Sequence, residues 1–176
     1  MKKISVFLVL CFSLGLFAAC SKEEEKTYDY TAGDVYDAIK EAYGEDFLPD
    51  GDMNEEEYTV TYGLDMDKVE DIKAGITMIS FHPDRLLVVK ARQGEGESVE
   101  ETLKAARENM VETGMWYPAN LAKVNASQVV RNGDYVAFIM LGAVDEREDA
   151  TEEEAAEFAK EQVQIGVDAF NALFEE

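Results

Sequence analysis

The stretch that decides the fold runs from residue 128 to residue 141 and reads Gln-Val-Val-Arg-Asn-Gly-Asp-Tyr-Val-Ala-Phe-Ile-Met-Leu. Its dipeptide Asn132-Gly133 tolerates the positive φ angles of a type I′ turn, so the flanking residues are expected to form a β-hairpin. The strands of this hairpin are predicted over Gln128–Arg131 and Asp134–Leu141. From Tyr135 onward every residue of the second strand is apolar or aromatic, which is typical of an interior strand covered on both faces.

A second hairpin is predicted upstream of the first. Its strands are expected over Ile76–Phe81 and Leu86–Ala91, and the tetrad His82-Pro83-Asp84-Arg85 joins them. Proline in this tetrad supplies the fixed φ that a type I turn needs at its second position. Together the two hairpins predict an antiparallel sheet of four strands.

Helix signals flank and separate the hairpins. Thr31, Ser98 and Thr151 are each followed three residues later by an acidic residue, which is the pattern of a capping box. The first helix is expected to end at Gly44 and the second at Gly114, whereas the third continues to the C-terminus. The intervening segments are predicted as a polar loop over Asp46–Asn54, short helices over Glu55–Tyr62 and Asp65–Lys73, and an aperiodic connection over Met115–Val124. These elements predict a single α+β domain over residues 31–176, with helices packed against the four-stranded sheet.

The first 20 residues predict export and a lipid anchor. Lys2 and Lys3 precede an apolar run too short to span a bilayer, and Ala18-Ala19 then lead to Cys20, as in the signal peptide of a bacterial lipoprotein. We therefore expect residues 1–19 to be removed and Cys20 to carry diacylglycerol, followed by an acidic tether that completes residues 20–30. The alternative is an ordinary signal peptide that is cut after Ala19 and leaves a free thiol.

Charge and cysteine content restrict the partners. The chain carries 38 acidic and 16 basic residues, a formal net charge of −22, which disfavours nucleic acid because the phosphate backbone would be repelled. The lipid, rather than surface charge, is expected to hold the protein on the extracytoplasmic side of the bacterial cell membrane. No cofactor is expected besides the diacylglycerol on Cys20, and the only other cysteine, Cys11, lies in the expected signal peptide.

Several short motifs occur in an order that resembles a known family. They are Tyr36-Asp37-Ala38-Ile39-Lys40, Tyr43-Gly44, Leu48-Pro49, Tyr62-Gly63-Leu64-Asp65, Met78-Ile79-Ser80, Tyr117-Pro118-Ala119-Asn120-Leu121, Ser127-Gln128-Val129-Val130-Arg131 and Gly133-Asp134-Tyr135-Val136. In this order they resemble the bacterial cell-envelope lipoproteins grouped as domain of unknown function 4358. The resemblance implies a lipid anchor and an exported domain, and it implies no activity, cofactor or catalytic residue.

Five residues are candidates for a binding surface. Trp116, Tyr117 and Asn120 lie in an aromatic stretch around a proline, and exposed aromatic residues beside proline form rigid contact surfaces. His82, the only histidine, and Asp84 lie on the predicted turn. The alternatives are that the aromatic residues fold back over the core and that His82 is a plain turn residue. Neighbours on one turn do not form a nucleophilic triad, so no catalytic residue is predicted, and no metal ligand either.

The expected function is that of a non-enzymatic binding or interaction module of the cell envelope. Its partner would be a protein, a peptide or a small solute. One alternative is a carboxylate- or divalent-ion-dependent enzyme that acts on an envelope polymer, which two converging acids with a raised pKa would favour. Another alternative is a structural assembly factor, which would expose an apolar patch.

Overall fold

The computed structural model describes residues 28–79, 81–145, 147 and 149–175. The expected signal peptide, Cys20 and the first part of the tether lie outside the described residues. The helices are α1 (Ala32–Tyr43), α2 (Gly96–Thr113), α3 (Leu121–Ala126) and α4 (Glu152–Ala172), with short turns η1 (Gly44–Asp46), η2 (Glu57–Thr61), η3 (Met66–Lys68) and η4 (Pro118–Asn120). The strands are β1 (Gly51–Asp52), β2 (Val69–Ile76), β3 (Arg85–Ala91), β4 (Gln128–Asn132) and β5 (Tyr135–Met140).

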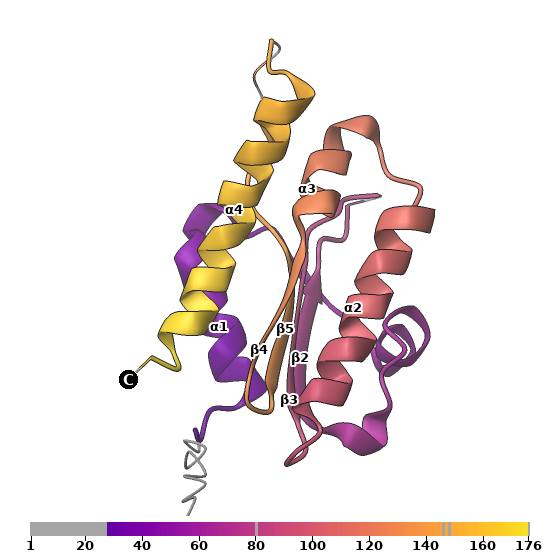
Figure 1. Cartoon of the computed structure of the whole chain (residues 1–176), viewed down its shortest axis with the longest axis vertical. Coiled ribbons are helices and arrows are strands. Elements are labelled where there is room, and N and C mark those ends of the chain that lie inside the picture. The colour runs from indigo at the N-terminus through magenta and orange to yellow at the C-terminus, as the bar shows by residue number, and fades with distance from the viewer. Residues whose placement is uncertain (1–27, 80, 146, 148, 176) are drawn as a thin grey trace, which may run out of the picture.

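One antiparallel sheet organises the described chain, with its strands in the order β1-β2-β3-β5-β4. α2 covers one face of the sheet, and α1 and α4 cover the other, so the fold has three layers (Figure 1). β5 is buried along its whole length between β3 and β4, which confirms the prediction of a covered interior strand. Its side chains alternate between the layers: Val136, Phe138 and Met140 pack toward α2, whereas Ala137 and Ile139 pack toward α1 and α4.

The sheet has five strands, so the prediction of four was wrong. The additional strand, β1, is only two residues long and pairs with the end of β2 inside the segment predicted as a polar loop. β2 begins inside the helix predicted over Asp65–Lys73, and of the strand predicted over Ile76–Phe81 only Ile76 lies in β2. The cause is a β-bulge between Val69 and Asp71, which interrupts the alternation of β2. Because of the bulge, Val69 and Ile72 pack against the same core although they are three residues apart in the sequence. This is the spacing of residues on one face of a helix.

Two of the three predicted capping boxes are confirmed. Thr31 and Thr151 each accept a hydrogen bond from the backbone of the acidic residue three positions on, whose carboxylate accepts one in return. α2 differs because it begins at Gly96, two residues before the predicted cap. The hydroxyl of Ser98 instead accepts a hydrogen bond from Lys68 Nζ at 2.6 Å.

Two connections also differ from the prediction. In the last hairpin Asn132 pairs with Tyr135, so the two-residue loop consists of Gly133 and Asp134. Within this loop only Gly133 has a positive φ (+54°), which fits a type II′ turn rather than the predicted type I′. The connection predicted over Met115–Val124 contains the helical turns η4 and α3.

The segment from Tyr28 to Tyr30 belongs to the folded body, although the sequence assigned it to the tether. The hydroxyl of Tyr135 lies 2.9 Å from the carbonyl oxygen of Tyr28 and 2.7 Å from that of Tyr30. The Tyr28 hydroxyl in turn donates to the carbonyl oxygen of Phe174 at 2.7 Å. The described chain therefore enters the fold beside Tyr135. No helix among the described residues combines the length and the apolar character needed to cross a membrane.

Candidate functional site

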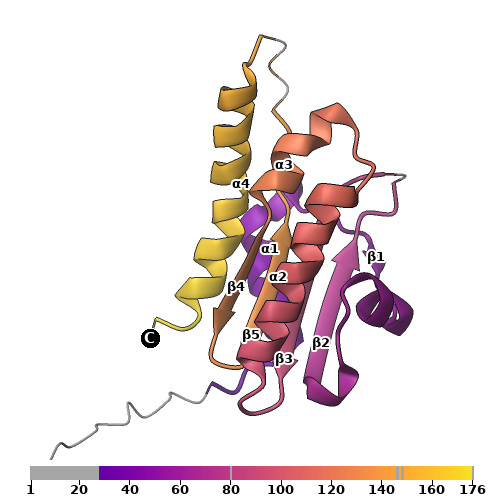
Figure 2. The ribbon, with the colours of Figure 1, turned by 45° about the vertical axis from the view of Figure 1, so that its right-hand side comes forward.

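The candidate binding residues lie on two segments at one end of the sheet. One segment, residues 77–84, connects β2 to β3, and the other, residues 114–120, leads out of α2. Both lie at the end where Arg85 of β3 pairs with Met140 of β5. The chain enters at the opposite end, beside Tyr135, as Figure 2 shows.

The two segments contact each other directly. Asn120 Nδ2 donates a hydrogen bond to the carbonyl oxygen of Phe81 at 3.3 Å. The rings of Tyr117 and Phe81 meet edge to face with their centroids 5.8 Å apart. The guanidinium group of Arg85 lies over the Trp116 ring, 5.2 Å from its centroid. The structure therefore brings the predicted aromatic residues and the predicted turn together.

A buried ion pair fixes the first segment to α3, the helix that follows the second segment. Asp84 is fully buried, and its Oδ1 lies 2.5 Å from Nζ of Lys123 in α3, a residue that is 3% exposed. Burial raises the pKa of the Asp84 carboxyl, and the cation of Lys123 acts against this shift. The second carboxylate oxygen of Asp84 has no hydrogen-bond partner among the described residues. Asp84 therefore joins the first segment to α3 internally and does not belong to the exposed surface to which the sequence assigned it.

His82 lies next to this ion pair. Its Nδ1 accepts a hydrogen bond from the backbone N–H of Asp84 at 3.3 Å and lies 3.6 Å from Asp84 Oδ1. The enzyme alternative requires two converging acids, one of them with a raised pKa. Asp84 has a raised pKa, but the charged side chains beside it are Lys123 and His82 rather than a second acid. In the part of the chain that the structure describes, no three His, Cys, Asp or Glu side chains are placed to hold a metal ion.

Large apolar side chains are exposed on the two segments. We define the apolar tip as Met78 (71% exposed), Ile79 (65%), Phe81 (54%), Met115 (84%) and Tyr117 (59%). Met78 forms its margin, because its side chain lies beside Gly51 of β1. Phe81 has a φ of +59°, in the left-handed region that aromatic residues rarely adopt, so its position carries backbone strain. Apolar side chains that gather in one exposed place mark interaction surfaces, whereas scattered ones do not.

A small recess adjoins the apolar tip, and we call it the Trp116 recess. It has a volume of 270 Å³ and is lined by Ile79, Phe81 and Met115 of the apolar tip and by Ile76, Thr77, His82, Arg85 and Trp116. Trp116 is fixed there because its Nε1 donates to the carbonyl oxygen of Met110 at 2.9 Å. Trp116 therefore forms a rigid wall of the recess.

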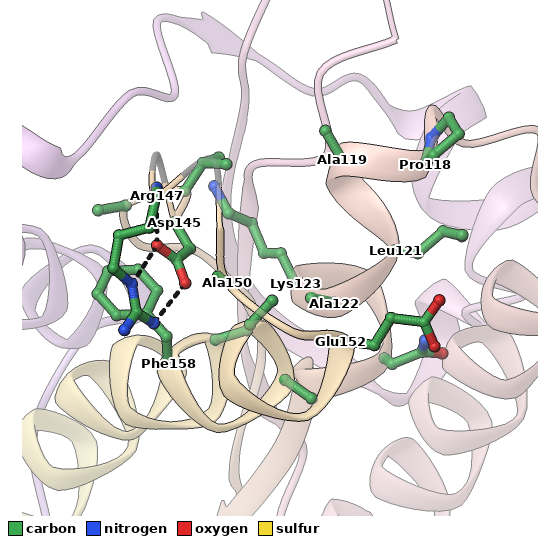
Figure 3. A pocket seen from close by; sticks show the side chains of 16 residues that line it. Pro118, Ala119, Leu121, Ala122, Lys123, Asp145, Arg147, Ala150, Glu152 and Phe158 are labelled. Carbon is green, nitrogen blue, oxygen red and sulfur yellow. Dashed lines mark hydrogen bonds and ion pairs between the residues drawn. The ribbon is translucent and has the colours of Figure 1, made fainter.

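A larger pocket of 510 Å³ lies between α3 and the first half of α4 (Figure 3). Alanine is its commonest lining residue. Arg147 at the pocket binds both carboxylate oxygens of Asp145, at 2.8 and 2.6 Å. Lys123 also lines the pocket, but its ammonium group is held by Asp84. Both cations of this pocket are thus already paired, and its walls are mainly small and apolar.

Sequence reasoning missed most of the apolar tip. Met78, Ile79 and Phe81 were placed in a strand, where alternate residues would have been buried. No local signal marked Met78 and Ile79 as exposed, because neighbouring large apolar residues are equally typical of an interior strand covered on both faces, such as β5. Lys123 was missed because its partner is 39 residues away in the sequence.

The fold and this end of the sheet define a three-layer α+β domain that exposes apolar loops opposite its point of chain entry. The profile of a family described as "Domain of unknown function (DUF4358)" matches residues 43–141, and the chain belongs to this family. The match spans the whole sheet, α2, α3 and the apolar tip, and it leaves out most of α1 and all of α4. Neither the curated proteins nor the solved structures that were searched contain a significant match.

Proposed function

We propose that this protein is a non-enzymatic binding module of the bacterial cell envelope, anchored through a lipid on Cys20, which uses the apolar tip to bind a polypeptide partner. One observation carries this proposal: large apolar side chains are exposed on two contacting segments, with Phe81 against Tyr117, and a buried ion pair fixes the first of these segments to α3. A surface that is already rigid loses little conformational entropy on binding, so its apolar area contributes more fully to affinity.

The position of the apolar tip supports a partner that lies away from the membrane. Tyr28 enters the fold beside Tyr135, at the end of the sheet opposite to the apolar tip. Only seven residues separate Cys20 from Tyr28, a flexible length of about 15 Å on average. A lipid on Cys20 would therefore hold the entry end near the bilayer and direct the apolar tip outward.

The charge of the chain supports a partner that carries basic residues as well as apolar ones. A formal net charge of −22 attracts cationic polypeptides over long range, while apolar contacts provide the short-range binding energy. The same apolar surface is what the structural assembly alternative requires, because an assembly factor also binds a polypeptide. Both readings therefore place the contact at the apolar tip.

Photo-cross-linking in living cells tests this proposal. A benzophenone amino acid in place of Met78 is expected to yield a discrete cross-linked protein, and Tyr117→Asn is expected to abolish that product. The matched control position is Val60, which is 76% exposed and lies in η2, outside both segments of the tip. Equal cross-linking from positions 78 and 60, or no effect of Tyr117→Asn, would contradict the proposal. Mass spectrometry of the purified chain tests separately whether Cys20 carries diacylglycerol.

A further inference from the structure

The Trp116 recess contains a buried polar group that the fold does not use. The Thr77 side chain lines the recess, the residue is 5% exposed, and its hydroxyl has no hydrogen-bond partner among the described residues. A buried hydroxyl without a partner destabilises the fold relative to one that is satisfied. Because Thr77 lines the recess, a ligand seated there can complete the hydrogen bond that this hydroxyl lacks.

Arg85 brings a positive charge to the same recess. Its Nε donates to the carbonyl oxygen of Pro83 at 2.9 Å, and its guanidinium plane is supported by the Trp116 ring. Among the described residues no carboxylate lies within ion-pair distance of Arg85, although Lys73, Arg131 and Arg147 all have such partners. In a chain with 38 acidic residues, a stacked arginine with remaining N–H groups is suited to bind a carboxylate from outside.

The neighbours of Arg85 within the chain do not fill this role. The buried Tyr62 hydroxyl lies near the Arg85 side chain but carries no negative charge, because burial raises its pKa. Asp84 is adjacent in the sequence, but its carboxylate contacts Lys123 on the side of α3. His82 lines the recess and adds donor capacity rather than negative charge. The remaining walls are the apolar and aromatic side chains of Ile76, Met115 and Trp116 and of the apolar tip. The recess thus offers one carboxylate site within apolar walls.

We propose that the Trp116 recess binds the C-terminal residue of the polypeptide partner, with an apolar side chain against Trp116 and its carboxylate on Arg85 and Thr77. This inference rests on the proposed function, because it specifies which part of the partner enters the site. The volume of 270 Å³ is on the scale of a single residue.

Fluorescence provides a direct test because Trp116 is the only tryptophan of the chain. The full chain on phosphatidylcholine vesicles is titrated with N-acetyl-leucine and, as the matched probe, with N-acetyl-leucinamide, which lacks the carboxylate. Equilibrium dialysis of radiolabelled probe gives a second measure of binding. We expect saturable binding of the acid and at least tenfold weaker binding of the amide.

Three variants separate binding from folding. Arg85→Gln is expected to weaken binding of the acid at least tenfold, whereas Arg92→Gln, an arginine at the other end of β3, is expected to leave it unchanged. Thr77→Val is expected to weaken binding at least threefold without lowering the melting temperature, because it removes a hydroxyl that has no partner in the free protein. A lower melting temperature for Arg85→Gln would leave Thr77→Val as the decisive variant.

Several results would overturn the inference. They are equal binding of the acid and the amide, no binding of either probe, or an equal effect of Arg85→Gln and Arg92→Gln. A cross-linked partner at position 78 together with any of these results would leave the proposed function intact and remove only the carboxylate site. Binding of the acid without a cross-linked partner would overturn the assignment of the recess to a polypeptide.

Discussion

Replacement of Lys123 by methionine, Lys123→Met, tests how strongly the buried ion pair holds the apolar tip. The variant keeps an unbranched side chain of similar length and leaves the fully buried Asp84 without its cation. Removal of one partner from a buried ion pair costs about 3–5 kcal/mol, because the remaining charge is buried without compensation. We expect a decrease of this size in the free energy of unfolding at pH 7, measured by urea denaturation. In thermal unfolding it corresponds to a decrease in melting temperature of roughly 6–20 °C.

The double variant Asp84→Asn/Lys123→Met identifies the cause of this loss. Because both charges are then absent, its stability is expected to return to within about 1 kcal/mol of the natural chain. Lys160→Met is the matched control, since Lys160 forms an exposed ion pair with Glu157 at 3.6 Å and such pairs contribute about 0.5 kcal/mol or less. A cost below about 1 kcal/mol for Lys123→Met, or a double variant as unstable as the single one, would refute the reasoning.

The pH dependence of Lys123→Met has a definite sign. Burial raises the pKa of the Asp84 carboxyl in the folded chain above the unfolded value of 3.8, and the variant removes the cation that opposes this shift. Between these two pKa values the folded state binds a proton that the unfolded state does not, so stability from this group decreases as pH rises. The deficit of Lys123→Met relative to the double variant, measured at each pH, is therefore expected to shrink as pH falls below the folded pKa.

Two further substitutions test the packing that positions the site. Gly166→Ala would place a Cβ atom 2.9 Å from the Tyr43 hydroxyl and 3.0 Å from Ile139. We expect this crowding between α1 and α4 to lower the stability measured by thermal unfolding by about 1–3 kcal/mol. Unchanged stability would mean that the contact is loose. Tyr135→Phe removes the hydroxyl that binds the carbonyl oxygens of Tyr28 and Tyr30, and we expect a loss of about 0.5–1.5 kcal/mol together with faster chymotryptic cleavage at these tyrosines. Cleavage at an unchanged rate would show that the aromatic contacts alone hold this segment.

Local signals were sufficient where one residue determines the structure nearby. The capping boxes of Thr31 and Thr151 were predictable because both partners lie within one helical turn. β5 was predictable because an uninterrupted apolar run needs cover on both faces. β2 was not predictable, because its bulge gives its apolar residues the spacing of a helix. β1 was not predictable either, because a strand of two residues has no periodicity.

The aromatic residues of the site were predictable from the sequence, but the buried ion pair and the stacked arginine that hold the site were not. Trp116, Tyr117 and Asn120 stood out in the sequence because aromatic residues beside proline are conspicuous whatever surrounds them. The burial of Asp84 could not be predicted, because it depends on a lysine 39 residues away in a helix that has no sequence signal. The role of Arg85 depends on its stacking against Trp116, which only the tertiary structure shows.

The contact between Tyr28 and Tyr135 has a mechanical consequence. A force applied to the chain at residue 28 passes through the Tyr135 hydroxyl into β5, which is hydrogen-bonded to a strand on each side. The same force reaches the end of α4 through the hydrogen bond from Tyr28 to Phe174. The force is therefore divided between an interior strand of the sheet and the helix α4 that covers it. It does not act on an edge strand, which would separate from the sheet more easily. The two loops that form the apolar tip lie at the opposite end of the sheet from this point of attachment.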